Sequence, residues 1–595
     1  MKLIKGFLTI LSIVTIFGGC TKVLDQPPRD AVTEDDFFND ANDLEIAVND
    51  LYSMLPTWTL YRDDQGSDNI VPNTLTDRIK GIRRTPSSKG SGGWSWSGLR
   101  KINWVIQGAN RIKDKDDNVS KYVGIAKFFR AYFYFDKVRH FGDVPWYSKV
   151  INSDDSTLLH KARDSRMLVM DSIMADLDYA IQNIPAEVKL YNITKYTALI
   201  LKAEVGLFEG TFRKYHNLGS YKEMLEASAS AAKELIDSKA YSLYEEGSPG
   251  ESYFNLFQLN DQDPTETILA RGYLKDIVNN NISYYLTAPT LGSFGFTQDF
   301  INGYLMNNGD RFTDQPGYEE KGFFEQFQDR DPRLKQTVQS PDYIVPGDTK
   351  PMEIDFQSTT TGYRVVKALE PRSNWCSGCS FHDVILWRYG ENLLIYAEAK
   401  AELGTITQTD LDISINKLRD RVGMPHLSLN NANANPDPYL ENLYKNVDKG
   451  ANEGVILEIR RERRVELANE GRRYWDLMRW KEGDIINRVP FVGVYFDGLG
   501  SYDFRNDGVE NVYLYSKSEG GSASDAPASA TSTINIDNNV LRDPNTGTTG
   551  GDKGNLFPNP GEQSFDIDKD YFYPIPLQDL VLNPNLKQNP GWDTP

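Results

Sequence analysis

The strongest constraint on the fold of this chain is the segment at residues 459–480, IRRERRVELANEGRRYWDLMRW, which mixes charged and large apolar side chains at helical spacing. Carboxylates recur at every fourth position and would form one acidic stripe along a helix: Glu458, Glu462, Glu466 and Glu470. Alone, these groups would repel one another. Arginines three positions away can pair with the stripe, and the remaining arginines can reach other elements. The segment therefore predicts a helix held by a buried or half-buried network of ion pairs.

Acid–base catalysis is the alternative role for these carboxylates. The surrounding arginines would keep them ionised, and an ionised carboxylate cannot protonate a substrate. We therefore expect a structural role. The residues to which we assign it are Glu462, Arg463, Glu466, Glu470, Arg473, Trp475 and Trp480.

Helical periodicity recurs over much of the chain. The spacing predicts helices at residues 42–55, 98–113, 119–140, 163–183, 194–215, 220–238, 383–403, 409–421 and 453–480. Small residues alternate with large ones in TALILKAEVGLFEG (197–210), which is typical of stacked helical hairpins of the tetratricopeptide type. No strict 34-residue period is visible, so the predicted repeats are degenerate. The fold class is mostly α.

Two regions break this helical pattern. Residues 241–380 mix Gly, Pro, Asn and aromatics, with short strands expected within 284–300 and 362–369. Residues 490–565 are looser still. Long irregular segments in a compact protein are commonly functional surfaces or disordered loops. We expect one domain over 41–595, with N-terminal hairpins at 41–240, an irregular ligand-binding region at 241–380, helices at 381–480, and loops at 481–595.

The N-terminus has the order of a secretory leader. Two lysines precede an apolar run, and two glycines then lead to Cys20. We expect residues 1–19 to be a lipoprotein signal peptide, Cys20 to be lipidated, and residues 20–40 to form an extended tether. An ordinary signal peptide with a chance cysteine is the alternative.

The charge balance argues against a nucleic-acid partner. The formal net charge is −19, and loss of the leader removes Lys2 and Lys5 but no acid, which makes it −21. The histidines are scattered, so we expect no metal site and no cofactor. Cys376 and Cys379 are expected to form a local disulfide, with free thiols or a redox or metal pair as alternatives.

Four segments of the chain resemble the signature motifs of the SusD/RagB family of Bacteroidetes outer-membrane lipoproteins. The first is the segment at 459–480. The others are FFRAYFYFDKVRHFGDVPW (128–146), HDVILWRYGENLLIYAEAKAELG (382–404) and YFYPIPLQDLVLNPNLKQNPGW (571–592). In the third, Gly390 and Asn392 depart from the residues usual in the family.

The resemblance implies a SusD-like fold and a lipid-anchored position on the outer membrane, facing the exterior. It also implies capture of oligosaccharides without cleavage, and their delivery, in the manner of a lid, to a SusC-like TonB-dependent barrel transporter. Capture of peptides, as in RagB, is the alternative. A surface glycoside hydrolase and a protein-interaction scaffold are further alternatives.

Ligand residues do not follow from these motifs, so we selected them by chemistry. A sugar site needs exposed flat aromatics beside amide or carboxylate groups. Trp94 and Trp96 lie in a Gly/Ser segment before a predicted helix, and we expect one of them to stack on the glycan. Packing of both rings on the first helices is the alternative. Asp68 and Asn69 are the expected polar neighbours.

A second aromatic group lies in the irregular region and is the other candidate surface for ligand. Its members are Tyr284, Tyr285, Phe294 and Phe296. Local packing of these rings is the alternative.

Overall fold

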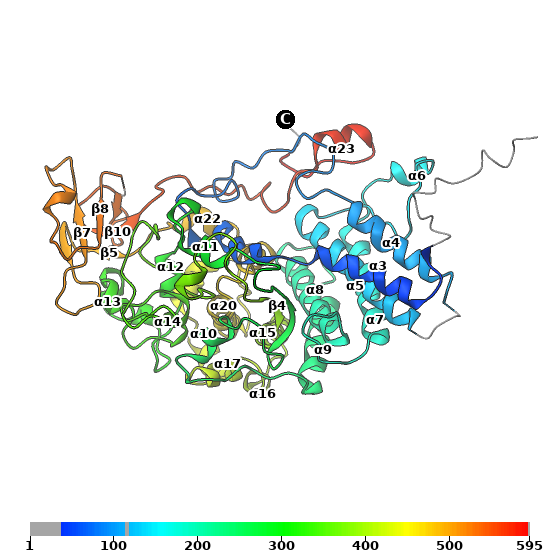
Figure 1. Cartoon of the computed structure of the whole chain (residues 1–595), viewed down its shortest axis with the longest axis horizontal. Coiled ribbons are helices and arrows are strands. Elements are labelled where there is room, and N and C mark those ends of the chain that lie inside the picture. The colour runs from blue at the N-terminus through cyan, green and yellow to red at the C-terminus, as the bar shows by residue number, and fades with distance from the viewer. Residues whose placement is uncertain (1–36, 114–117, 539, 593–595) are drawn as a thin grey trace, which may run out of the picture.

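The computed structural model describes residues 37–113, 118–538 and 540–592. Helices of the N-terminal part lie at one end of the elongated molecule, and most of the short strands lie at the opposite end (Figure 1). The C-terminal segment runs back from the strands toward the helical end (Figure 1). Cys20 and the expected leader and anchor lie outside the described residues. Within the described part of the chain, no helix is long and apolar enough to span a membrane.

The long N-terminal helices form where periodicity predicts them. They are α3 (Ala41–Leu51), α4 (Ser97–Ala109), α5 (Val119–Phe141), α7 (Arg166–Asn183), α8 (Lys195–Tyr215) and α9 (Lys222–Ser238). Each packs on its neighbour along the chain, α4 on α5, α5 on α7, α7 on α8 and α8 on α9. Helices that follow one another in the chain therefore pack together, as the predicted helical hairpins require.

Local sequence signals set the ends and the spacing of these helices. Thr194 caps α8 by accepting from the backbone N–H of Thr197, and α5 ends at Gly142, whose φ is +70°. Gly206 and Gly210 let α8 approach α9 closely, because a Cβ at Gly206 would lie 2.7 Å from the carbonyl oxygen of Met224. The small residues noted in the sequence are therefore packing positions.

Three predicted helices are interrupted in the structure. Residues 409–421 form α16 (Gln408–Asp412) and α17 (Ile415–Arg421). Residues 383–403 form strand β4 (Val384–Arg388) followed by α15 (Tyr389–Glu402). Residues 453–480 form α20 (Glu453–Glu466) and α21 (Arg473–Arg479), because Asn469 and Gly471 adopt left-handed backbone angles between them.

The remaining helices are short. They are α6 (Ser156–Leu159), α10 (Ser252–Leu256), α11 (Ile282–Thr287), α12 (Gln298–Asn302), α13 (Phe323–Gln326), α14 (Arg333–Thr337), α16 (Gln408–Asp412), α17 (Ile415–Arg421), α18 (Leu429–Ala434), α19 (Pro438–Leu443), α22 (Ile485–Arg488) and α23 (Leu577–Leu582), with one longer 3₁₀ segment, η2 (Trp58–Gly66).

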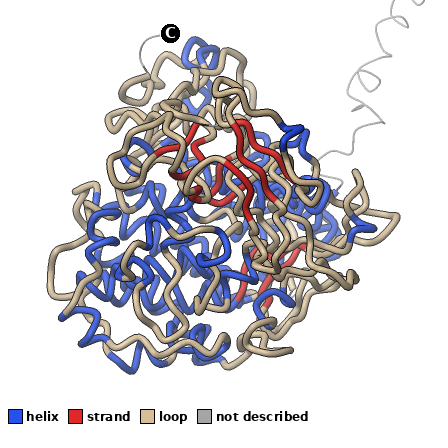
Figure 2. The backbone as a smooth tube through the Cα atoms, turned by 90° about the vertical axis from the view of Figure 1, so that its left-hand side faces the viewer, coloured by secondary structure: helices blue, strands red, loops and turns tan. Residues whose placement is uncertain are grey.

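Ten short strands occur in the described residues and form small sheets. Besides β4 they are β1 (Ile70–Val71), β2 (Thr267–Arg271), β3 (Gly295–Phe296), β5 (Tyr495–Phe496), β6 (Gly500–Tyr502), β7 (Val512–Tyr515), β8 (Ser532–Asn535), β9 (Val540–Arg542) and β10 (Gly554–Phe557). The sheet orders are β1-β3, β2-β4, β5-β10-β9 and β6-β7-β8. Viewed from the strand end, the strands lie in small groups among loops, and helices and loops fill the rest of the view (Figure 2). The expected strand at 362–369 is absent from this described segment, which forms only isolated bridges.

The charged segment forms the predicted buried network. Glu466 is fully buried and pairs with arginines from three other elements, Arg388 of β4 at 2.7 Å, Arg421 of α17 at 2.6 Å and Arg333 of α14 at 3.1 Å. Burial opposes ionisation, but these guanidinium groups hold the pKa of Glu466 well below its ordinary value. The carboxylate therefore joins distant segments rather than donating protons.

Several arginines of the segment at 459–480 pair with acids outside the acidic stripe. Arg463 pairs with Asp476 at 2.8 Å, and Arg473 pairs with Asp68 at 2.7 Å. Trp480 is buried and donates from Nε1 to Glu398 at 2.7 Å. The segment forms the ion-pair network that the sequence predicts, although among the described residues only Arg461 reaches the acidic stripe at the expected spacing, with Glu458 at 3.5 Å.

Candidate functional site

The structure places Trp94 and Trp96 in the helical layer rather than on an open surface. Trp94 is only 2% exposed, and its ring meets that of Phe141 edge-on at 4.8 Å. Trp96 is half-buried and contacts the rings of Trp94 and Tyr147. The expectation that one of these two rings is exposed does not hold for Trp94, because α5 supplies the apolar partner that the Gly/Ser segment lacks. The alternative, packing on the first helices, is what the structure has.

Asp68 and Asn69 belong to the ion network. Asp68 is fully buried and pairs with Arg473 at 2.7 Å and Arg464 at 3.0 Å. Burial alone would raise the pKa of Asp68, but the charges of Arg464 and Arg473 lower it to about 2. Asn69 accepts from Nε of Arg464 at 2.8 Å. Neither side chain is open to a ligand, which corrects the sequence prediction.

The second aromatic group is also mostly internal. Tyr285, Phe294 and Phe296 are buried, and only Tyr284 is half-buried. Tyr285 packs on Phe294 with ring centroids 4.4 Å apart. The expected role of these three rings in stacking on ligand is therefore wrong, since local packing covers them.

The disulfide expected from the sequence is present in the structure. Cys376 and Cys379 form a disulfide with Cα atoms 5.3 Å apart. The described residues hold no group of three or more side chains suited to a metal ion.

Three cavities are large enough to compare as ligand sites. One, of about 570 Å³, lies at the strand end, and we call it the strand-end pocket. Its lining includes Asn73, Ser293, Phe356, Gln357, Tyr515 and Thr533. This volume lies within the range typical of small-molecule sites, about 300–1,000 Å³.

Segments far apart in the sequence build the strand-end pocket. Strand β1 pairs with β3, with Val71 opposite Gly295, and this pairing brings Asn73 beside the loop that carries Ser293. The backbone N–H of Phe356 donates to Oγ of Ser532 at 3.0 Å, which ties a third loop to β8. Strand β8 runs parallel to β7, so Tyr515 lies opposite Asn535.

Hydrogen bonds fix this wall before any ligand arrives. Nδ2 of Asn73 donates to Oγ of Ser293 at 3.1 Å, and that hydroxyl lies 2.6 Å from the carbonyl oxygen of Gln357. Thr360 donates to the carbonyl oxygen of Val71 at 2.6 Å. Such cross-links keep the polar groups in place and lower the entropic cost of binding.

Several groups in the pocket remain available. Within the described part of the chain, the side chains of Gln357, Thr533 and Tyr515 make no hydrogen bond, and Gln357 and Thr533 are exposed. Phe356 is half-buried and adds apolar ring area. Amides and hydroxyls beside an aromatic ring are the groups that a sugar surface requires.

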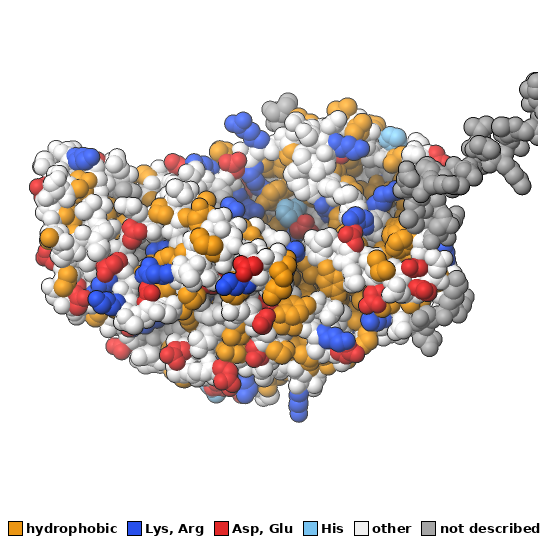
Figure 3. Space-filling model, viewed as in Figure 1, with side chains coloured by type: hydrophobic (Ala, Val, Ile, Leu, Met, Phe, Trp, Pro, Cys, Tyr) orange, Lys and Arg blue, Asp and Glu red, His pale blue; other side chains and the backbone are white. Residues whose placement is uncertain are grey.

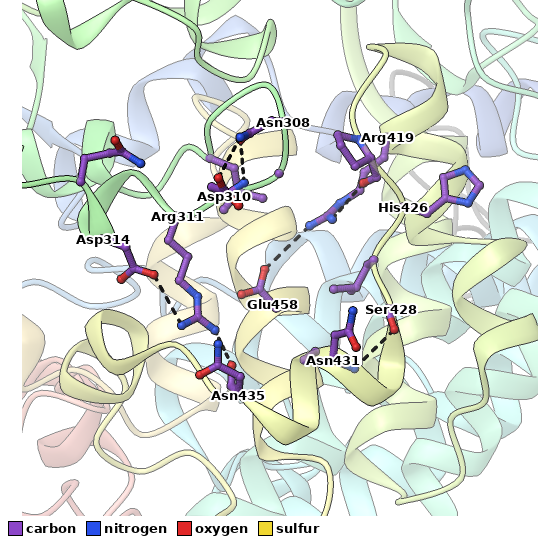
Figure 4. Close-up of a pocket in the computed structure, with 16 residues that line it drawn as sticks. Asn308, Asp310, Arg311, Asp314, Arg419, His426, Ser428, Asn431, Asn435 and Glu458 are labelled. Atoms are coloured by element: carbon purple, nitrogen blue, oxygen red, sulfur yellow. Dashed lines mark hydrogen bonds and ion pairs between the residues drawn. The ribbon is translucent and has the colours of Figure 1, made fainter.

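A second cavity, of about 460 Å³, has a different chemistry (Figure 4). Arg419 lies 3.8 Å from Glu458 across it, and Arg311 lies 3.9 Å from Asp314 at its edge. Its lining contains no Phe, Tyr or Trp side chain. It offers charges but no ring on which a sugar could stack.

A third cavity, of about 250 Å³, lies between η2, α5 and the segment at 459–480. It contains aromatic rings, but these are already engaged. Arg139 covers Trp475 at 4.7 Å, and Nε1 of Trp387 donates to Glu204 at 2.8 Å. It is smaller than typical ligand sites. The strand-end pocket is therefore the best candidate.

The sequence predicts the irregular regions that border this pocket but does not identify the residues that line it. Residues 284–300 supply Pro289 and Ser293, not the rings selected there. Residues 530–535 border a Ser/Ala/Gly-rich stretch and were expected to be loose. One signal is present in the sequence, because Ile534 and Ile536 alternate with Thr533 and Asn535 as in a strand.

Comparison with known sequences identifies the family. The profile described as "SusD family" matches residues 256–592, more than half of the chain. The chain belongs to the SusD family. A second profile, described as "Starch-binding associating with outer membrane", matches residues 80–217 of this SusD-family chain.

Individual relatives agree with this assignment. The SusD-family chain is 25% identical to SusD-like protein P38 of Formosa agariphila over 496 residues, which cover 80% of this chain and 90% of that protein. It superposes on a SusD-like protein from Bacteroides fragilis with a TM-score of 0.64 at 21% identity, covering 95% of this chain and all of that one. A SusD-like carbohydrate binding protein from the same species gives 0.62 at 20% identity, covering 93% and 100%. The SusD-like helical fold predicted from the sequence is thus confirmed.

Proposed function

We propose that this chain is a glycan-binding lipoprotein of the outer membrane that captures oligosaccharides at the strand-end pocket. The observation that carries the proposal is the composition of that pocket, in which amides and hydroxyls surround Phe356 and Tyr515. Sugars present hydroxyl groups and apolar ring faces, and these two kinds of side chain match them. Two of the similarities support the same class of ligand. One is to the profile described as "Starch-binding associating with outer membrane", and the other is to the SusD-like carbohydrate binding protein from Bacteroides fragilis.

The captured glycan is delivered to a SusC-like TonB-dependent barrel transporter, over which the protein closes as a lid. The leader ending at Cys20 supports a lipid anchor at the outer membrane, since several acyl chains on one residue hold a protein stably. The barrel should therefore co-purify with this protein from solubilised outer membranes.

The role is binding rather than cleavage. Catalysis of glycoside hydrolysis needs two carboxyl groups flanking the scissile bond. The strand-end pocket is lined by no carboxylate side chain within the described residues. A bound oligosaccharide should therefore be recovered intact.

Affinity electrophoresis tests this function directly. Purified mature protein should be retarded in native gels that contain polysaccharide, and the polysaccharide should keep its chain length after incubation. Retardation by no polysaccharide, together with binding of peptides in calorimetry, would replace this function with peptide capture. Release of shortened sugars would make the protein an enzyme.

A further inference from the structure

We infer that the strand-end pocket selects uncharged oligosaccharides and excludes glycans that carry uronate or sulfate groups. This inference rests on the proposed function and adds the chemical class of its ligand. Two independent features of the pocket carry it, the absence of ionisable side chains of either sign and the direction of its internal hydrogen bonds.

The first feature is charge. Charged residues make up 25% of the chain, so sixteen lining positions drawn at random would include about four, yet none of the sixteen that line this pocket is Asp, Glu, Lys or Arg. The other two cavities contain both signs, with Arg311, Arg419 and Glu458 in one and Arg139 and Glu204 in the other. The absence of charge is therefore specific to this pocket. At the strand end, white atoms dominate the surface in view, with single acidic and basic side chains among them (Figure 3).

An anionic sugar would find no compensation in such a site. Moving a carboxylate out of water is unfavourable unless an opposite charge or several strong donors replace its hydration. No Arg or Lys lines the pocket, and the formal net charge of −19 repels anions at long range. A neutral sugar incurs neither cost.

The second feature is the use of the hydroxyl protons. Ser293 donates to the carbonyl oxygen of Gln357 at 2.6 Å, Thr360 donates to that of Val71 at 2.6 Å, and Thr531 lies 3.2 Å from that of Ile354. Their protons are therefore engaged within the protein, so these oxygens can offer a ligand only acceptor positions. Oδ1 of Asn73 is a further acceptor, because only Nδ2 of this amide is engaged.

Acceptors distinguish the two classes of glycan. A sugar hydroxyl donates a hydrogen bond to each of these oxygens, whereas a carboxylate or a sulfate has only acceptor atoms to offer. Gln357, Thr533 and Tyr515, whose side chains make no hydrogen bond with the described residues, supply uncharged donors for the oxygens of the neutral sugar. The pocket therefore matches ligands that bring their own protons.

The test compares neutral and acidic probes on the mature protein. The neutral probes are hexasaccharides of β-1,3-glucan, α-1,4-glucan and β-1,4-mannan. The acidic probes are oligogalacturonate, oligoalginate, sulfated galactan oligosaccharides, and the same three neutral hexasaccharides after oxidation of their primary hydroxyls to carboxylates. Calorimetry should detect at least one neutral probe, with affinity that changes less than threefold between 50 and 500 mM salt. Oxidation of that probe should weaken binding at least tenfold.

A charge-introducing variant sharpens the comparison. Thr533→Lys should improve binding of the oxidised probe at least fivefold, and this gain should disappear at 500 mM salt. Gln182→Lys adds the same charge on the exposed face of α7, among the N-terminal helices. This variant should leave the affinity for the neutral probe and for its oxidised form unchanged.

The possible failures are distinguishable. Acidic probes that bind as tightly as neutral ones, or tighter, would overturn the inference while the glycan-binding function stands. Binding of no saccharide probe by wild-type protein would overturn the proposed function and the inference together.

Discussion

Oδ1 of Asp68 lies 2.7 Å from Nε of Arg473, although the two residues are 405 positions apart in the sequence. Both side chains are buried, and Arg464 approaches the same carboxylate at 3.0 Å. This contact joins the N-terminal part of the chain to the segment after α20. Its loss would leave two buried guanidinium groups without their shared counter-charge.

Asp68→Asn should therefore lower the free energy of unfolding by about 3–5 kcal/mol, the usual effect of breaking a buried pair. Denaturant titration followed by circular dichroism measures the change. Asp50→Asn is the matched control, because its pair with Lys101 is exposed on both sides and should contribute no more than about 1 kcal/mol. Equal effects of the two variants would show that the network does not stabilise the fold.

Asp68 should account for part of the loss of folding stability in acid. The folded-state pKa of Asp68 is lowered from 3.8 to about 2. Its contribution to stability is therefore complete above pH 4 and is lost as pH falls through 2, by roughly 2 kcal/mol in total. The curve of unfolding free energy against pH should be shallower in this window for Asp68→Asn than for wild type. Parallel curves would contradict the assigned pKa.

Trp94 should affect stability and not ligand binding. Trp94→Ala removes a buried ring packed on Phe141 and should cost about 3–5 kcal/mol. Trp94→Phe keeps apolar area and should cost less than half as much. Folded protein of either variant should bind glycan with wild-type affinity in calorimetry. A loss of affinity at unchanged stability would restore this tryptophan as a ligand residue.

The disulfide should have a small, local effect. Cys376 and Cys379 enclose a very short loop, for which the chain-entropy relation gives about 2 kcal/mol at most. The double serine variant should therefore unfold at slightly lower denaturant concentration and keep its glycan affinity. A greater loss of stability, or loss of binding, would mean that this loop supports the pocket.

Periodicity predicts the long helices of this fold well but does not predict which rings are covered. The pattern at residues 119–140 is sufficient for α5, since 3.6-residue spacing is a local property. The burial of Trp94 depends on Phe141, and that of Asp68 on Arg473, and neither partner can be found from local sequence. The break between α20 and α21 was likewise missed, although Gly471 was a visible signal for it.

The residues that line the strand-end pocket cannot be predicted from local sequence patterns. Its wall combines Asn73, Ser293, Gln357 and Thr533, which come together only through β1–β3 and β7–β8 pairing. Strand pairing of two or four residues gives little periodic signal. The predicted irregular region at 241–380 supplies Ser293, Phe356 and Gln357 to the candidate pocket, but most of the aromatic rings selected in that region are covered.

The most direct measurement of the central claim is calorimetric titration of one retained neutral hexasaccharide into wild type and Gln357→Ala/Thr533→Ala. Both side chains are exposed in the pocket and make no hydrogen bond with the described residues, so the variant should fold normally. Loss of two ligand hydrogen bonds should weaken binding at least tenfold. Gln182→Ala/Thr157→Ala, the same exchanges at exposed positions of the helical half, should bind as wild type does. Unchanged affinity in the pocket variant would contradict the assignment of the strand-end pocket as the glycan site.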